Sequence, residues 1–173
     1  MKFIKGFDKV TNVLTKIGGY IAAVTLLFNV VIVLANVILR IKGGSIVGTE
    51  EYISMGEVVL IFMALGYTQY SHGLVHVCFF MKKLPKLGPV IAWMLEQWVG
   101  VVIAALWIWQ TIKRIPVVTQ VTTALLIPYR PFYYVIAIGV GIYLVAQLFE
   151  ACKSTAALFN AEIREDVVNN WPA

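Results

Sequence analysis

Charged residues are scarce in this chain. Only 13% of its 173 residues are Asp, Glu, Lys or Arg, whereas 60% are hydrophobic, and the mean hydropathy is +0.83. Soluble domains carry about a quarter charged residues, and a globule of this length could not cover so much apolar surface with a polar shell. The composition therefore excludes an ordinary soluble protein and predicts an integral membrane protein, with residues 1–173 forming one membrane domain.

Cysteine and histidine are almost absent, which argues against a disulfide framework, a metal site and a haem site. Cys78 and Cys152 fit neither a disulfide framework nor a metal motif. His72 and His76 are one helical turn apart, so they cannot reach both faces of a haem, and zinc would require a third ligand. We expect these histidines near the cytoplasmic interface, bonded within the protein or to a neighbour.

Catalytic motifs are also missing. The sequence has no nucleophile elbow, phosphate loop or paired catalytic acids, and its basic residues form no dense patch. We therefore expect no enzymatic activity, no metal, no cofactor and no nucleic-acid partner.

What the chain has instead is four long hydrophobic runs. They cover approximately residues 17–39, 49–70, 87–111 and 131–149, and each is long enough for a hydrocarbon core of about 30 Å. The basic, amphipathic residues 1–16 predict an interfacial helix, and residues 150–173 predict a polar tail that could continue as a short surface helix. The expected fold is an all-α membrane protein with four transmembrane helices.

The distribution of lysine and arginine predicts the orientation of these helices. Nine of the 14 basic residues would lie on one side of the membrane and five on the other. The nine are Lys2, Lys5, Lys9, Lys16, Lys82, Lys83, Lys86, Lys153 and Arg164, and the five are Arg40, Lys42, Lys113, Arg114 and Arg130. The positive-inside rule then places both termini and the 71–86 connection in the cytoplasm.

Aromatic and small residues mark the third run. The expected membrane-interface anchors lie near its two ends and are Trp93, Trp98, Trp107 and Trp109. Gly100 and Ala104 form a small-xxx-small pair, which lets helix backbones approach closely. Either packing among the four helices or docking against a partner membrane protein would explain this pair.

Polar residues form stripes on the first two runs. On the second run the stripe consists of Glu50, Ser54, Glu57, Ala64, Thr68 and Ser71. On the first run, extended to residue 40, it consists of Thr25, Asn29, Asn36 and Arg40. Because the two runs are sequential and antiparallel, we expect the stripes to meet, with Arg40 clamped to Glu50, Glu51 or Glu57. Glu57 lies about 12 Å beyond Thr49, which also leaves a coupling-ion or proton site as an alternative.

Four segments carry a family resemblance. They are VILR at 37–40, GTEEYISMGEVVLIFMALGY at 48–67, SHGLVHV at 71–77 and TALLIPYRPFYYVIAIGVGIYL at 123–144. In this order and spacing the chain resembles the small membrane subunit (DctQ-like or SiaQ-like) of tripartite ATP-independent periplasmic (TRAP) transporters.

The resemblance implies a location and partners. The chain would lie in the bacterial inner membrane, among lipids, beside a large DctM-like subunit that moves substrate by an elevator motion. A periplasmic DctP-like binding protein would deliver an organic acid, such as a dicarboxylate or a sialic acid, for sodium-driven uptake. The small subunit would act as a fixed brace.

Two other functions are compatible with a small membrane protein. A membrane-anchor subunit of a redox enzyme would need paired histidines on separate helices. A self-assembling channel or exporter would conduct or transport without a large subunit.

Overall fold

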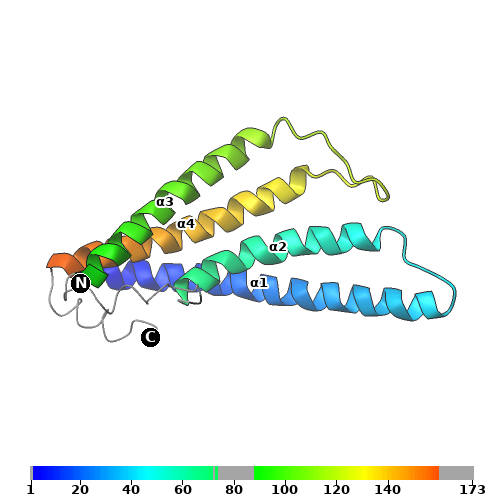
Figure 1. The fold of residues 1–173 in the computed structure, drawn as a ribbon, viewed down its shortest axis with the longest axis horizontal. Helices are drawn as coiled ribbons and strands as arrows, with labels where there is room; N and C mark the ends of the chain where they lie inside the picture. Colours follow the sequence, from blue (N-terminus) through cyan, green and yellow to red (C-terminus); the bar gives the residue numbers. More distant parts are fainter. Residues whose placement is uncertain (1, 72, 74–87, 160–173) are drawn as a thin grey trace.

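The computed structural model describes residues 2–71, 73 and 88–159. These ranges hold four helices, α1 (Lys2–Ile41), α2 (Thr49–Tyr70), α3 (Gly88–Arg114) and α4 (Arg130–Phe159), and they contain no strand (Figure 1). A single antiparallel bridge joins Val121 to Pro128 within the α3–α4 connection. The predicted all-helical class is confirmed.

Helix α1 is continuous over 40 residues, whereas the sequence predicts an interfacial helix followed by a separate span. Gly18 and Gly19 stand at the predicted junction without interrupting the helix. They serve a close crossing instead, because a Cβ on Gly18 would lie 2.6 Å from the backbone oxygen of Met63. On Gly19 it would lie 3.1 Å from the ring of Tyr67. The glycine pair therefore brings α1 against α2.

Helix α2 is held closely on its other flank by α4. A Cβ on Gly66 would come within 2.7 Å of the Ile142 side chain, and Gly139 of α4 lies directly against the backbone of Phe62. Small residues allow this approach, as they do between membrane helices in general. Helices α1, α2 and α4 therefore form a closely packed trio.

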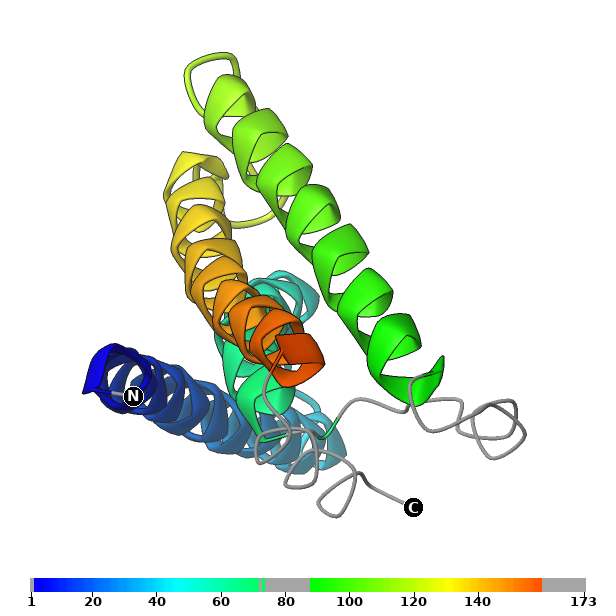
Figure 2. The same ribbon diagram turned by 90° about the vertical axis from the view of Figure 1, so that its left-hand side faces the viewer.

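Helix α3 packs mainly on α4 and stands apart from α1, with α2 and α4 between them (Figure 2). Near its start, Trp93 and Val90 pack with Ala157 and Leu158 of α4 in a small apolar cluster. Helix α4 extends to Phe159, past the predicted end at residue 149, because Ala151 and Ala157 remain fully buried there. Residues 160–173, the rest of the predicted tail, lie outside the described residues.

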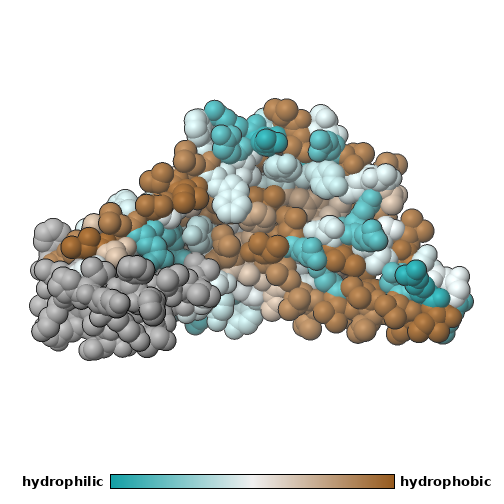
Figure 3. Space-filling model, in the orientation of Figure 1, coloured by the Kyte–Doolittle hydropathy of each residue, from teal (hydrophilic) through white to brown (hydrophobic). Residues whose placement is uncertain are grey.

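Many large hydrophobic side chains are exposed on the molecular surface. Val24 of α1 is 67% exposed and Ile103 of α3 is 57% exposed, and hydrophobic side chains cover much of the surface over α1 (Figure 3). Three segments are long and apolar enough to cross a membrane, namely Lys9–Ile41, Val90–Arg114 and Arg130–Leu158. The chain is an integral membrane protein, and three of the four predicted spans coincide with such segments.

Candidate functional site

The first polar centre joins α2 to the α3–α4 connection. Glu51, in the first turn of α2, accepts the backbone N–H groups of Ala124 at 2.6 Å and Leu125 at 2.9 Å through its two carboxylate oxygens. Leu125 also packs so closely on Gly48 that a Cβ there would lie 2.7 Å away. Gly48 has φ +75°, a conformation that glycine adopts without strain. We call these contacts of Glu51 and Gly48 the loop anchor.

The connection is also ordered by its own hydrogen bonds. The buried side chain of Thr122 accepts the backbone N–H of Ile127 at 3.0 Å, and the backbone N–H of Thr122 donates to the oxygen of Ile127. Arg130 donates to the backbone oxygen of Pro116 at 3.2 Å. The loop anchor therefore holds a structured turn rather than a loose segment.

The second polar centre is a layer of three buried glutamines, one each from α2, α3 and α4. Gln69 donates its side-chain N–H to Oε1 of Gln97 at 3.1 Å, and Gln147 donates to the backbone oxygen of Gln97 at 3.3 Å. Each is at most 5% exposed. Buried amides that bond across helices stabilise membrane bundles, so this glutamine layer fixes α3 against α2 and α4.

The structure does not form the predicted Arg40 clamp. Among the described residues, Arg40 is exposed and no ion pair joins it to Glu50, Glu51 or Glu57. Asn36 of α1 already lies level with Ile46, which precedes α2, so Arg40, one turn further along α1, lies beyond the start of α2. Of the three glutamates, only Glu51 makes a described hydrogen bond.

The asparagines of the α1 stripe contact α2 and the α1–α2 connection. Asn29 lies against Gly56 and donates to the backbone oxygen of Ile53 at 3.4 Å. Asn36 accepts the backbone N–H of Ile46 at 3.0 Å and so fastens the α1–α2 connection. They therefore hold α1 to α2 through backbone groups.

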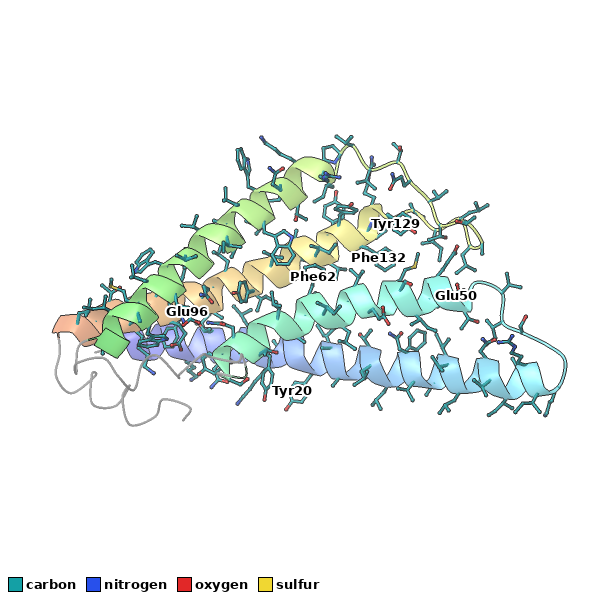
Figure 4. All side chains as sticks on the ribbon, viewed as in Figure 1. Tyr20, Glu50, Phe62, Glu96, Tyr129 and Phe132 are labelled. Carbon is teal, nitrogen blue, oxygen red and sulfur yellow. The ribbon has the colours of Figure 1, made fainter. Side chains whose placement is uncertain are left out.

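Two pockets lie at the end of the bundle that carries the α1–α2 and α3–α4 connections. One, of about 330 Å³, is lined by Glu50, Glu51, Ser54, Met55, Val58, Thr122, Thr123, Tyr129 and Phe132. Figure 4 shows Glu50 on α2 at the same end of the bundle as Tyr129 and Phe132. The other, of about 280 Å³, is lined by Lys113, Arg114, Val117, Val118, Thr119, Gln120 and Tyr133. This end of the molecule thus presents an acidic pocket and a basic pocket.

The predicted tryptophan anchors separate into two groups. Trp93 is only 4% exposed and packs in the apolar cluster with Val90, so the structure places it inside the bundle instead of at its surface. The others are 42–53% exposed. Trp98 donates to Thr155 at 3.1 Å, Trp107 packs edge-on against Phe62, and Lys113 lies 3.9 Å above the Trp109 ring.

The predicted partner contacts on α3 face inward. Gly100 lies directly against the side chain of Gln147, and Ala104 is fully buried. Of the two explanations for this pair, the structure supports internal packing, because a larger residue at Gly100 would displace Gln147. His72 and His76 lie outside the described residues. In the described part of the chain, no group of three or more His, Cys, Asp or Glu could hold a metal ion.

Sequence reasoning noted the loop-anchor carboxylate but assigned it to Arg40, and it missed the glutamine layer. Gln69, Gln97 and Gln147 could have been found as isolated amides inside otherwise apolar runs. Their mutual contact depends on how the three helices are rotated relative to one another. The periodicity of residues within a single helix does not give this rotation.

Comparison with known proteins gives a family match. Residues 29–156, about three quarters of the chain, match the family described as "Tripartite ATP-independent periplasmic transporters, DctQ component". No curated protein and no solved structure matches the chain. The matched region includes the loop anchor, the glutamine layer, all of α2 and α3, most of α4 and the last third of α1. The chain therefore belongs to the DctQ family and is a small membrane subunit of a TRAP transporter.

Proposed function

We propose that this subunit is a fixed brace for the large membrane subunit during sodium-driven, binding-protein-dependent uptake of an organic acid of the dicarboxylate or sialic acid class. The observation that supports the proposal is that polar groups of this subunit form hydrogen bonds within the subunit itself. The Glu51 carboxylate accepts backbone N–H groups of the α3–α4 connection, and the three buried glutamines bond to one another across α2, α3 and α4. Polar groups that form hydrogen bonds within the subunit stiffen the helix bundle, and we propose that they do not line a path for substrate.

The proposal includes α2 as a fourth crossing. Its 22 residues correspond to about 33 Å of helix, slightly more than a hydrocarbon core of about 30 Å. Helices α1 and α4 flank it along its length and are themselves apolar enough to cross. With four crossings, both termini lie in the cytoplasm, and the membrane is the bacterial inner membrane.

The surface supports partners on more than one side. The outward faces of α1 and α3 are exposed and apolar, as lipid or a large DctM-like subunit requires. The acidic and basic pockets lie at the end opposite the N-terminus, which would face the periplasm and a DctP-like binding protein in this orientation. The role of Trp98, Trp107 and Trp109 as interface anchors belongs to the same proposal.

Reconstitution tests this function. The chain, the large subunit and the binding protein encoded with them would be placed in proteoliposomes under a sodium gradient, with candidate organic acids offered separately. We expect uptake only when all three components are present and none from this chain alone. Transport by the chain alone would favour the channel or exporter function instead. A Soret absorbance band in the purified chain would favour the redox anchor.

A further inference from the structure

Helix α2 has one face that the other three helices leave open, although its first residues, Glu50 and Ser54, also line the acidic pocket. Gly56, Met63 and Tyr67 meet α1, while Phe62 and Gly66 meet α4. Between these flanks lies an arc of about 80° at 100° per residue. The arc comprises Glu50, Ser54, Glu57, Ile61, Ala64 and Thr68, and we call it the open face of α2. The first four of these residues are exposed, and hydrophilic patches lie over α2 in Figure 3.

Helix α3 does not cover this face either. Its described contacts with α2 run from Trp107 to Phe62 and from Gln97 to Gln69. Both α2 residues lie about 100° or more around the helix from Glu57. Beyond the acidic pocket, the open face around Glu57 and Ile61 therefore stays exposed when the four helices are assembled.

Glu57 determines what can cover the face. It lies about 12 Å beyond Thr49 along the helix axis, between the exposed residues Ser54 and Ile61. Within the described residues its carboxylate forms no ion pair. If α2 crosses the membrane, a carboxylate at this depth is costly unless protein, water or an opposite charge surrounds it. The occupant must therefore offer hydrogen-bond donors or a positive charge at the level of Glu57.

This requirement argues against two simple occupants. Hydrocarbon chains of lipids have no donors. A second copy of the chain, packed through the same face about a two-fold axis, would bring equivalent surfaces together and set Glu57 near its own copy. Like charges at that distance repel each other.

We propose that the open face of α2 docks a membrane helix of the large subunit, and that Glu57 pairs there with a lysine or arginine of that helix. This inference rests on the proposed assembly with a large subunit. The inference specifies that the large subunit contacts the open face of α2 and that its helix carries a basic residue opposite Glu57. Ile61 supplies the apolar contact one turn along, while Ala64 leaves room for a close approach.

Charge reversal on the complete complex tests the pairing. The small subunit would carry Glu57→Lys, Glu57→Gln or the control Arg40→Glu, a charge reversal at a site that is also exposed but lies at the end of α1, outside the open face. Co-purification through a tag on the large subunit should fall about tenfold or more for Glu57→Lys, with a smaller loss for Glu57→Gln. The control should stay within about twofold, because screening weakens charges near the membrane surface. Wild-type recovery of the Glu57→Lys complex would overturn the pairing.

Photo-crosslinking tests the face without relying on charge. A diazirine amino acid would be placed at position 61 and, as control, at Val59 on the opposite side of α2. We expect adducts with the large subunit from position 61 and only internal adducts from position 59. Adducts from position 61 with lipid alone or with a second copy would overturn the inference. Failure of the wild-type chain to co-purify with the large subunit would contradict the proposed function itself. This result differs from one that contradicts only the docking face, in which the wild-type complex still forms. Circular dichroism and gel filtration of each purified variant would identify a folding defect.

Discussion

The carboxylate of Glu51 holds the backbone of Leu125, a residue 74 positions further along the chain, at 2.9 Å. A second hydrogen bond, from the N–H of Ala124, makes the contact bidentate. One side chain of α2 thus fixes a turn between α3 and α4.

Removal of the loop anchor should loosen that turn. In Glu51→Ala the N–H groups of Ala124 and Leu125 lose their acceptor, so we expect a lower melting temperature in detergent and faster proteolysis within residues 115–129. Glu50→Ala is the matched control, because Glu50 is exposed and makes no described hydrogen bond. Equal proteolysis of the two variants would show that the anchor does not restrain the turn.

The glutamine layer should contribute measurably to stability. Gln69→Leu leaves Oε1 of Gln97 without its donor, and we expect a loss of about 1 kcal/mol. Unfolding by a denaturing detergent would measure the change. A double-mutant cycle with Gln97→Leu should give a coupling energy of about 0.6 kcal/mol, the average for such bonds in membrane proteins. Gln110→Leu, at an exposed position of α3, should change stability little. A coupling energy of zero would show that the hydrogen bond between Gln69 and Gln97 does not stabilise the fold.

Two glycine-to-alanine changes should act in opposite directions. Gly18→Ala places a Cβ 2.6 Å from a backbone oxygen of α2, which cannot move independently, so we expect a loss of about 1–3 kcal/mol. Gly141→Ala meets Ile108 at an ordinary 3.7 Å and should gain up to about 1 kcal/mol, because alanine favours the helix. The same detergent titration measures both variants. A destabilised Gly141→Ala variant would contradict the α3–α4 packing described above.

Helices α1 and α2 show which parts of the fold can be predicted from the sequence. The bounds of α2 match the predicted run of residues 49–70, because apolar length and the turn at Gly48 are local features. The sequence predicts an interfacial helix over residues 1–16 that leads into a span over 17–39, whereas the structure has one helix across both. The sequence also does not reveal that Gly18 lies against Met63 of α2, because this contact joins residues far apart in the chain.

The polar sites show a similar limit. Periodicity correctly grouped Glu50, Ser54 and Glu57 on one face of α2, since a helix repeats every 3.6 residues. It could not identify the neighbour of that face, which depends on how α2 is rotated against α1. The expected Arg40 pairing is not formed, because Arg40 lies beyond the start of α2, although Asn29 of the same stripe does contact α2.

Single-tryptophan variants should distinguish the buried Trp93 from the surface Trp109. In bilayers that contain brominated lipids, we expect the fluorescence of Trp109, which is 53% exposed, to be quenched strongly. Trp93 should retain most of its emission, because the start of α3 and the end of α4 shield it. Comparable quenching of both would mean that lipid reaches the apolar cluster.

The length of α1 has a consequence for the bilayer around it. Forty helical residues extend about 60 Å, roughly twice the hydrocarbon thickness. Transmembrane helices rarely tilt by more than about 40°, and even at that angle α1 would project about 15 Å beyond the hydrophobic core. Thr11 and Thr15 are fully buried near this projecting end, so part of it is held by the bundle. Helix α1 would therefore link the membrane interior to the region beyond the lipid headgroups as one continuous helix.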